Sequence, residues 1–349
     1  MRVLLTGATG NVGTSVLEAL AREPQVEEVV GLARRVPEIR PPKVTWRAAD
    51  VTSSDLTALF GGADAVVHLA WAIQPSRDEA LLERVNVLGS QRVFEAVAEA
   101  GVPTLVYASS VGAYAPGPKD RPVAESWSVD GIQTSFYSRH KSRVEALLDA
   151  FESNSPRTRV VRLRPGLIFK REAASEIRRL FIGPFLPGFL VRPELIPIVP
   201  RVERLRFQAV HSRDVGEAYR LALVRPVRGA FNVAAEPAIG PEELGRLLHA
   251  RPVPVSAGLL RRAAEVTWKL RLQPSPPGWI DMALGVPLMD TTRAREELGW
   301  SPSRSSLDAL GELLSGLRHA DGLSTPPRDR LAGGPARLGE LATGVGARR

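Results

Sequence analysis

The sequence predicts a doubly wound α/β protein, and three features of the chain lead to that prediction. Short apolar runs alternate with helical patterns of apolar residues through the first half. A glycine-rich turn directly follows the first apolar run. From about residue 165 proline and glycine interrupt the pattern, and from about residue 320 periodicity is lost. We therefore expect a Rossmann-type parallel sheet, a smaller C-terminal lobe and a disordered tail.

The first half of the chain supplies most of the predicted sheet. Helical spacing of apolar residues follows the first strand at Val12, Val16, Leu17 and Leu20, and a long helix is expected from about Asp78 to Ala100. Strands are expected at residues 3–5, 29–32, 44–46, 65–69 and 104–107. Because strands buried on both faces are continuous apolar runs, this order predicts a parallel sheet with helices on both faces.

The second half is less regular. Proline and glycine cluster at residues 182–188 and 193–200, strands are expected at Val210 and 231–233, and helices at 242–249 and 259–270. A return to strand after an irregular stretch predicts a lobe whose chain re-enters the sheet domain. We expect a Rossmann domain at 1–165 with returning segments near 207–235, a lobe at 166–206 and 236–318, and a disordered tail at 319–349.

Composition excludes several classes of protein. The 349 residues are 44% apolar and 24% charged, as in ordinary soluble globular proteins, and include no cysteine. Disulfide frameworks, thiolate metal sites and cysteine nucleophiles are therefore excluded, and the five dispersed histidines predict no metal site. The net charge of +8 would suit nucleic acid, but 41 of the 46 basic residues are scattered arginines, so we expect no nucleic-acid partner. Since no apolar run approaches the ~20 residues of a membrane span, we expect a cytoplasmic protein without a membrane partner.

The glycine-rich turn is the strongest local motif. It consists of Thr6-Gly7-Ala8-Thr9-Gly10-Asn11-Val12-Gly13, between an apolar strand and an amphipathic helix. Glycines at these positions allow a tight turn, a close approach of the backbone to a pyrophosphate, and close packing of the helix on the sheet. The N-terminus of the helix offers N–H groups to phosphate oxygens. The turn therefore predicts a dinucleotide site.

The spacing of the three glycines resembles that of the extended short-chain dehydrogenase/reductase superfamily, which includes the NAD-dependent epimerases and dehydratases. Further segments resemble motifs of that superfamily and occur in the same order: Asp50-Val51, His68-Leu69-Ala70, Asn86-Val87 with Gly89, Tyr107 to Tyr114, Tyr137-x-x-x-Lys141, Arg164-Pro165-Gly166, Val210 to Val215, Phe231-Asn232-Val233, and Arg295 to Trp300. Together they cover about residues 1–315. The resemblance implies a Rossmann domain that binds NAD or NADP and a lobe that binds a small-molecule substrate.

The cofactor site implied by the resemblance extends beyond the glycine turn. NAD sites commonly place an acidic residue about 20 residues after the turn, to bind the ribose hydroxyl, but this chain has Arg34 and Arg35 there. Because arginine pairs well with a 2′-phosphate, we prefer NADP over NAD. The alternative is that both arginines are simply solvated. The implied cofactor residues are Gly7, Thr9, Gly10, Asn11, Val12, Gly13, Arg34, Arg35, Asp50, Val51, Leu69, Ala70, Asn86, Tyr137 and Lys141.

Tyr137 and Lys141 are the expected proton-transfer residues. Being four apart, they share one face of a helix, and a nearby ammonium favours the phenolate and lowers the pKa of a tyrosine. The resemblance adds Ser110 as the hydroxyl that binds the substrate oxygen, so the implied catalytic set is Ser110, Tyr137 and Lys141. It also implies that Asn86 supports cofactor placement or a water relay.

The histidines are expected to have other roles. His68 is expected to line the cofactor or lie in the core, and His140 to be solvated because it points away from the Lys141 face. His211 and Asp214 superficially suggest a catalytic pair. The resemblance places that segment near the junction with the lobe, so we interpret both residues as structural.

Three classes of function remain. The first is an NAD(P)-dependent oxidoreductase that moves hydride between nicotinamide and a substrate alcohol or ketone, with Tyr137 as general acid and base. The second is a nucleotide-sugar epimerase with tightly bound NAD, and the third is a catalytically silent dinucleotide sensor. Dehydratases of the superfamily have Asp-Glu after the catalytic hydroxyl residue, whereas this chain has Val111-Gly112. Neither of these residues can act as an acid or a base, so we reject dehydration. The intact catalytic set argues against the sensor.

The substrate is less defined by the sequence. Epimerases often have Asn-Pro-Tyr-Gly around the tyrosine and Arg-Tyr-Phe-Asn after the sixth strand, and this chain has Ser135 to Ser138 and Leu163 to Gly166 instead. These departures weaken the hypothesis of a nucleotide-sugar substrate without excluding it. Apolar residues between Phe181 and Val199 either line a hydrophobic substrate pocket or belong to the core. We favour the oxidoreductase, and a homodimer is an arrangement that the sequence leaves open.

Overall fold

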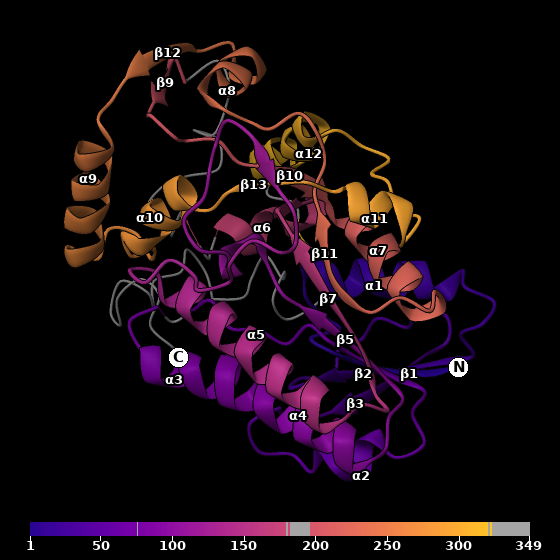
Figure 1. The fold of residues 1–349 in the computed structure, drawn as a ribbon. Helices are drawn as coiled ribbons and strands as arrows, with labels where there is room; N and C mark the ends of the chain where they lie inside the picture. The colour runs from indigo at the N-terminus through magenta and orange to yellow at the C-terminus, as the bar shows by residue number, and fades with distance from the viewer. Residues whose placement is uncertain (75, 179–180, 182–195, 320–321, 323–349) are drawn as a thin grey trace.

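The computed structural model describes residues 1–74, 76–178, 181, 196–319 and 322. A seven-stranded sheet in the order β11-β7-β5-β4-β1-β2-β3 lies at its centre (Figure 1). Neighbouring strands in this sheet are all parallel, which confirms the predicted Rossmann-type fold. The strands are β1 (Arg2–Thr6), β2 (Glu28–Ala33), β3 (Val44–Ala48), β4 (Ala65–His68), β5 (Thr104–Ala108), β7 (Arg159–Pro165) and β11 (Gly229–Val233).

Side chains of successive strand residues enter two different cores, because they alternate between the faces of the sheet. Val3 and Leu5 pack with one pair of helices, and Leu4 between them packs with the helices of the other face. Figure 1 shows α4 and α5 on one side of the sheet and α1 and α7 on the other. The first core contains α1 (Asn11–Ala21) and α7 (Ser212–Val224), and the second contains α2 (Leu56–Phe60), α4 (Gly89–Glu99) and α5 (Phe136–Asn154).

The long helix predicted from Asp78 to Ala100 is present but changes its winding. It begins as α3 (Glu79–Glu83), whose N-cap Asp78 accepts a hydrogen bond from Leu81 N, and it ends as α4. Between them Arg84–Leu88 forms a π-helical turn. Such turns are rare, and where they occur they often lie at functional sites. This one contains Asn86.

The chain re-enters the sheet domain after residue 208. Helix α7 packs on α1 so closely that a Cβ on Gly216 would lie 2.5 Å from Ser15 O, and β11 pairs with β7 at the edge of the sheet. Pairs of short strands and several helices form the rest of the described chain. The strand pairs are β8 (Leu167–Phe169) with β10 (Ala209–His211), β9 (Ile198–Arg201) with β12 (Arg251–Pro254), and β6 (Pro122–Val123) with β13 (Leu288–Met289).

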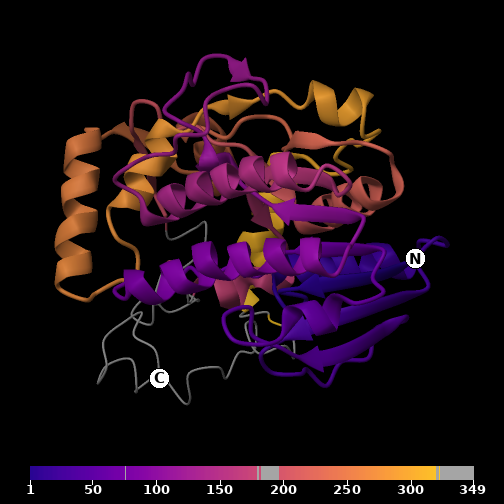
Figure 2. The ribbon, with the colours of Figure 1, turned by 60° about the horizontal axis from the view of Figure 1, so that its bottom comes forward.

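The remaining helices include the two predicted for the second half, which are α8 and α9. They are α6 (Ala174–Ile177), α8 (Pro241–Leu248), α9 (Ala257–Lys269), α10 (Gly278–Gly285), α11 (Thr292–Glu296) and α12 (Ser306–His319), with 3₁₀ turns at Val111–Ala113 and Arg171–Ala173. Helix α9, orange in Figure 2, stands at the edge of the molecule. None of the helices in the described ranges is both long and apolar enough to cross a lipid bilayer. Residues 182–195 of the proline-rich stretch, and 320–321 and 323–349 of the predicted tail, lie outside the described residues.

Candidate active site

The strand order reverses at β1, which has β2 on one side and β4 on the other. In open α/β sheets, ligands bind in the crevice at the carboxyl ends of the strands where the order reverses. The glycine turn follows β1 at this point, and Leu69 and Ala70 follow β4. Their backbone N–H groups both donate to Thr6 Oγ1, at 3.2 Å each. The structure therefore joins the glycine turn to the loop that follows β4.

Two glycines of the turn have no room for a side chain. Gly7 has a φ of +68°, and a Cβ there would lie 2.8 Å from Ala70 N. A Cβ on Gly13 would lie 2.4 Å from Gly7 O. Gly10 is the N-cap of α1, and the first turn of that helix has no acidic residue. The N-terminus of α1 is therefore suited to a phosphate group, as the sequence predicts.

Asn11 and its neighbours complete the turn. Thr9 is buried, and Val12 packs partly against the core of α1 and α7. Asn11 Nδ2 donates to Ile168 O at 3.1 Å. The buried Asn11 Oδ1 has no hydrogen-bond partner among the described residues. Because buried polar atoms are normally paired, a donor on a bound ligand would satisfy this oxygen.

The expected residues after β2 and β3 differ in their surroundings. Arg34 and Arg35 follow β2 directly and are exposed. Asp50 Oδ1 accepts hydrogen bonds from Thr52 N at 2.8 Å and Thr52 Oγ1 at 2.7 Å, and Val51 is buried in the second core. Arg34 and Arg35 are therefore open to solvent at the end of β2. Asp50 instead stabilises the turn at residues 50–52 through its hydrogen bonds with Thr52.

Asn86 holds the loop after β4. The side chain is fully buried, with Oδ1 accepting from Ala72 N at 2.7 Å and Nδ2 donating to Ala72 O at 2.8 Å. This paired contact resembles one rung of a sheet and fixes the backbone beside Trp71. Asn86 thus fixes the conformation of the loop after β4 through its two hydrogen bonds with the backbone of Ala72.

Ser110 and Tyr137 are brought together by two elements. Ser110 follows β5, and its Oγ accepts from Gly112 N at 3.0 Å, which leaves the Ser110 O–H to donate elsewhere. Tyr137 lies in the first turn of α5, after the N-cap Ser135. The Tyr137 ring packs on the turn after Ser110, because a Cβ on Gly112 would lie 2.8 Å from Tyr137 Cε1, and the nearby Ser110 hydroxyl lowers the pKa of Tyr137 in part. Two of the three predicted catalytic side chains therefore lie side by side.

Lys141 lies one turn further along the same face of α5. Its Nζ donates to Ala108 O at 2.6 Å and to Tyr107 Oη at 3.4 Å. It also lies 3.4 Å from the ring centre of Trp71 and 5.9 Å from that of Tyr137. Burial lowers the pKa of Lys141 well below its usual value, and nearby Glu145 opposes this shift. The third member of the set is close to Tyr137 but is directed towards a carbonyl and an indole.

The pKa of Tyr137 is raised, and the predicted lowering is therefore wrong for this state of the protein. Burial raises the pKa, and the nearby Ser110 hydroxyl opposes the rise only in part. The physical reason is that Lys141 is itself removed from water and cannot supply the expected stabilisation of a phenolate. The phenol consequently keeps its proton at neutral pH, which suits a proton donor.

Glu145 is a buried carboxylate that the sequence analysis missed. It accepts from Arg164 Nε at 2.8 Å, from Arg162 Nη1 at 2.9 Å, and from Ser109 Oγ. Burial alone would raise its pKa, but the two arginines hold the pKa at about 2. The network ties α5 to β7 and to the end of β5. A signal was present, because Glu145 continues the four-residue spacing of Tyr137 and Lys141.

His68 and His140 are both buried. His68 contacts Thr6 Oγ1 at 2.7 Å and Ser90 Oγ at 3.0 Å, and burial lowers its pKa to about 3, so it belongs to the core. The expectation of a solvated His140 is wrong, since only 2% of the residue is exposed and its ring lies 5.8 Å from that of Phe136. Helix α5 is covered on more than one face, which periodicity alone did not indicate.

His211 and Asp214 have separate partners. His211 Nδ1 accepts from Arg213 N at the start of α7, and its Nε2 lies 3.1 Å from Glu312 Oε2. Asp214 accepts from Ser303 Oγ and from the backbone N–H of residue 304. These contacts link α7 to the segment that begins α12.

Two tryptophans beside Tyr137 were also missed. The ring centre of Trp71 lies 5.8 Å from that of Tyr137, and the ring centre of Trp279 lies 5.0 Å from it. Trp71 directly follows Leu69-Ala70, and that position was a usable signal. Trp279 belongs to α10 in the lobe, and nothing in the sequence connected it to Tyr137.

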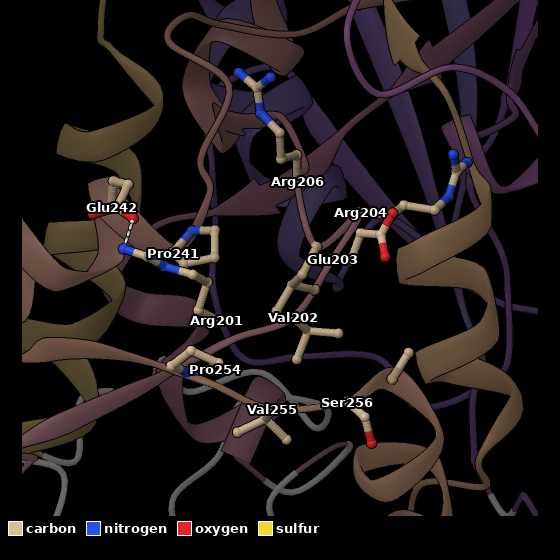
Figure 3. Close-up of a pocket in the computed structure, with 12 residues that line it drawn as sticks. Arg201, Val202, Glu203, Arg204, Arg206, Pro241, Glu242, Pro254, Val255 and Ser256 are labelled. Carbon is tan, nitrogen blue, oxygen red and sulfur yellow. Dashed lines mark hydrogen bonds and ion pairs between the residues drawn. The ribbon is translucent and has the colours of Figure 1, made fainter.

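A separate cavity of about 650 Å³ lies in the lobe (Figure 3). Residues 201–206, 241–242 and 254–257 line it, and Arg201 is ion-paired with Glu242 at its rim. Its lining includes none of the predicted cofactor or catalytic residues. Most of the predicted residues lie instead after β1, β4 and β5 and at the start of α5.

The fold and the glycine turn together define a class, the Rossmann folds with a dinucleotide-binding turn after the first strand. The family model described as the NAD dependent epimerase/dehydratase family matches residues 3–234. The chain belongs to this family, as the resemblance implied.

Individual relatives agree with this membership. An uncharacterized protein of Mycobacterium bovis is 27% identical over 329 residues, which cover 93% of this chain and 31% of that protein, so the chain spans about a third of its length. The L-arabinose 1-dehydrogenase (NAD(P)(+)) of Haloferax volcanii is 36% identical over 110 residues, or 31% of this chain and 41% of the dehydrogenase. The UDP-glucuronic acid 4-epimerase from Bacillus cereus, in complex with UDP-glucuronic acid and NAD, has a TM-score of 0.66 and 17% identity, with 92% of this chain and 100% of that chain covered. This last likeness is one of fold.

Proposed function

We propose that the protein is an NAD(P)-dependent oxidoreductase that interconverts a ketone or aldehyde and the corresponding alcohol. The observation that carries the proposal is the placement of Ser110 and Tyr137 side by side at the start of α5, with the Tyr137 ring packed on Gly112. It places a proton-donating hydroxyl and an orienting hydroxyl together, with Lys141 one turn away. The partial similarity to an NAD(P)-dependent dehydrogenase supports the same reaction class.

The residues of the crevice fit a nicotinamide dinucleotide. Gly7 and Gly13 bring bare backbone to the N-terminus of α1, where a pyrophosphate would bind, and Asn11 Oδ1 is a buried acceptor that still needs a donor. Arg34 stands exposed where a 2′-phosphate would lie, which supports our preference for NADP. Tyr137 and Lys141 would contact the nicotinamide end.

When bound, the nicotinamide supplies or accepts the hydride and its electron pair. In the reducing direction Tyr137 donates its phenolic proton to the substrate oxygen while the carbonyl carbon gains hydrogen. Ser110 donates a hydrogen bond to the same oxygen and orients it. The raised pKa of Tyr137 keeps the proton in place until the substrate oxygen becomes basic. In the oxidising direction the phenolate accepts the alcohol proton, with Lys141 as the nearest potential cation.

A nucleotide-sugar epimerase is the second candidate, and it is favoured by the description of the family and by the nucleotide-sugar complex of the similar fold. The two candidates differ in the fate of the dinucleotide. An epimerase should be purified with the dinucleotide bound and should show no net turnover of it. An oxidoreductase must exchange the dinucleotide in each cycle.

The test measures oxidation of NADPH and NADH with a panel of aldehydes, ketones and UDP-sugars. We expect net oxidation with a carbonyl compound, and we expect Tyr137→Phe to lower turnover by a factor on the order of 10²–10⁴, the usual worth of a positioned acid. The dissociation constant of the dinucleotide and the melting temperature serve as controls and should be retained. Stoichiometric dinucleotide in the purified protein, with sugar isomerisation and no net oxidation, would establish the epimerase instead.

A further inference from the structure

An aromatic wall built from both the Rossmann domain and the lobe lies beside Tyr137. We define this wall as Trp71, Trp279, Phe181 and Phe136. The ring centres of Trp71 and Trp279 lie 5.8 Å and 5.0 Å from that of Tyr137. Phe181 and Phe136 extend the wall, with ring centres 4.9 Å and 6.1 Å from that of Trp279. Tyr137 and Trp279 both pack on a buried apolar cluster that consists of Ile132, Met282 and Val286.

The wall is held in place by contacts between distant parts of the chain. The loop after Trp71 is bonded to the segment before Trp279, since Gln74 Nε2 and Ser76 Oγ both donate to Pro274 O, at 3.2 Å and 2.6 Å. The Rossmann loop and the lobe segment therefore form one support for the two indoles. Such support favours a preformed site over a loose surface contact.

The polar groups of the wall are few and of one kind. Nε1 of Trp71 and Nε1 of Trp279 are buried and have no hydrogen-bond partner within the described parts of the chain. Both are donors that cannot accept. The Nζ atom of Lys141 lies against the Trp71 ring, 3.4 Å from its centre. A nucleotide sugar, with a diphosphate and many hydroxyls, would leave most of its polar groups unpaired against such a wall.

We propose that the aromatic wall makes this centre a site for a flat, apolar carbonyl compound, such as an aryl ketone, with Trp279 as the residue that determines this specificity. The substrate ring would pack on the faces of the indoles, while its carbonyl oxygen would accept from Tyr137. The reaction at the carbonyl rests on the proposed function, but the binding preference can be measured without turnover.

The test measures binding of 2-acetonaphthone and of UDP-glucose to the full chain saturated with oxidised dinucleotide, by isothermal titration. We expect 2-acetonaphthone to bind at least about 10-fold more tightly than UDP-glucose. Trp279→Ala should raise the ketone dissociation constant about 10-fold, and Trp279→Phe should raise it less because the ring remains. Trp268→Ala is the matched control and should leave the constant unchanged, since Trp268 belongs to α9 and its ring packs against Arg77 rather than Tyr137.

The outcomes are separable from those of the proposed function. Tighter binding of UDP-glucose, no saturable binding of the ketone, or equal effects of the Trp279 and Trp268 substitutions would overturn the inference. If Trp279→Ala does not fold, the ketone-to-nucleotide preference of the wild type still decides. Ketone binding that depends on Trp279, without any net oxidation of NADPH, would retain the site and refute only the oxidoreductase.

Discussion

Glu145→Gln is expected to destabilise the protein more than any exposed ion-pair substitution, because it removes a charge on which two buried arginines depend. The side chains of Glu145, Arg162 and Arg164 are 0%, 6% and 5% exposed. The pKa of Glu145 falls from its usual 4.5 to about 2 in the folded protein. At 1.36 kcal/mol per unit of pKa, the folded state favours the ionised carboxylate by about 3 kcal/mol. Breaking a buried pair by removing one partner costs about 3–5 kcal/mol, which is the same order.

The assay is urea denaturation of the wild type and the Glu145→Gln variant between pH 7 and pH 3. Because the folded pKa lies below the unfolded one, the contribution of Glu145 is complete above about pH 4.5 and is lost as pH falls towards about 2. We expect a difference in unfolding free energy of about 3 kcal/mol at pH 7 that shrinks below pH 4.5.

Asp149→Asn is the matched control. Asp149 also pairs with Arg162, at 2.6 Å, but its side chain is 65% exposed. Exposed pairs contribute about 0–1 kcal/mol, so this variant should lose less than about 1 kcal/mol. Equal losses in the two variants, or a Glu145 effect that does not change between pH 5 and pH 3, would refute the reasoning.

Three further predictions concern the dinucleotide site and a buried lysine. Gly13→Ala should abolish dinucleotide binding or folding, because its Cβ would lie 2.4 Å from Gly7 O, whereas Gly311→Ala in α12, with nothing within 4 Å, should be tolerated in melting and binding assays. Arg34→Asp should weaken NADP more than NAD in binding titrations, and equal losses would contradict the NADP preference. Burial, with Arg204 and Arg206, lowers the pKa of Lys119 to about 7. Because the unfolded lysine keeps its proton to about pH 10, the unfolding free energy of the wild type should rise relative to Lys119→Met between pH 7 and pH 10, and a constant difference would count against this.

The sequence was sufficient for the glycine turn and for every strand of the main sheet except β7, because these depend on local signals. Strand β7 was not predicted, since three arginines interrupt its apolar residues. Buried parallel strands need continuous apolar runs, and Gly7 and Gly13 have backbone neighbours that exclude a Cβ. The strand pairs β9–β12 and β6–β13 were not predicted, since strands of two to four residues, three of which include proline, carry almost no pattern.

The environment of Tyr137 could not be predicted from the sequence, because it depends on tertiary contacts. Its pKa is raised rather than lowered because burial acts on both Tyr137 and Lys141. His140 is buried for a related reason, as its neighbour Phe136 contacts Trp279 of the lobe. These effects arise from residues far apart in the sequence, so neither helix periodicity nor motif spacing could indicate them.

Transfer of deuterium from C4-deuterated NADPH in a single turnover tests the central claim most directly. With the best carbonyl compound of the panel, the wild type should place the label on the carbinol carbon of the alcohol product. Tyr137→Phe should slow this transfer by a factor on the order of 10²–10⁴ while dinucleotide affinity is retained. Label transfer at the wild-type rate in Tyr137→Phe across neutral pH would contradict the assignment of Ser110, Tyr137 and Lys141 as the reaction centre.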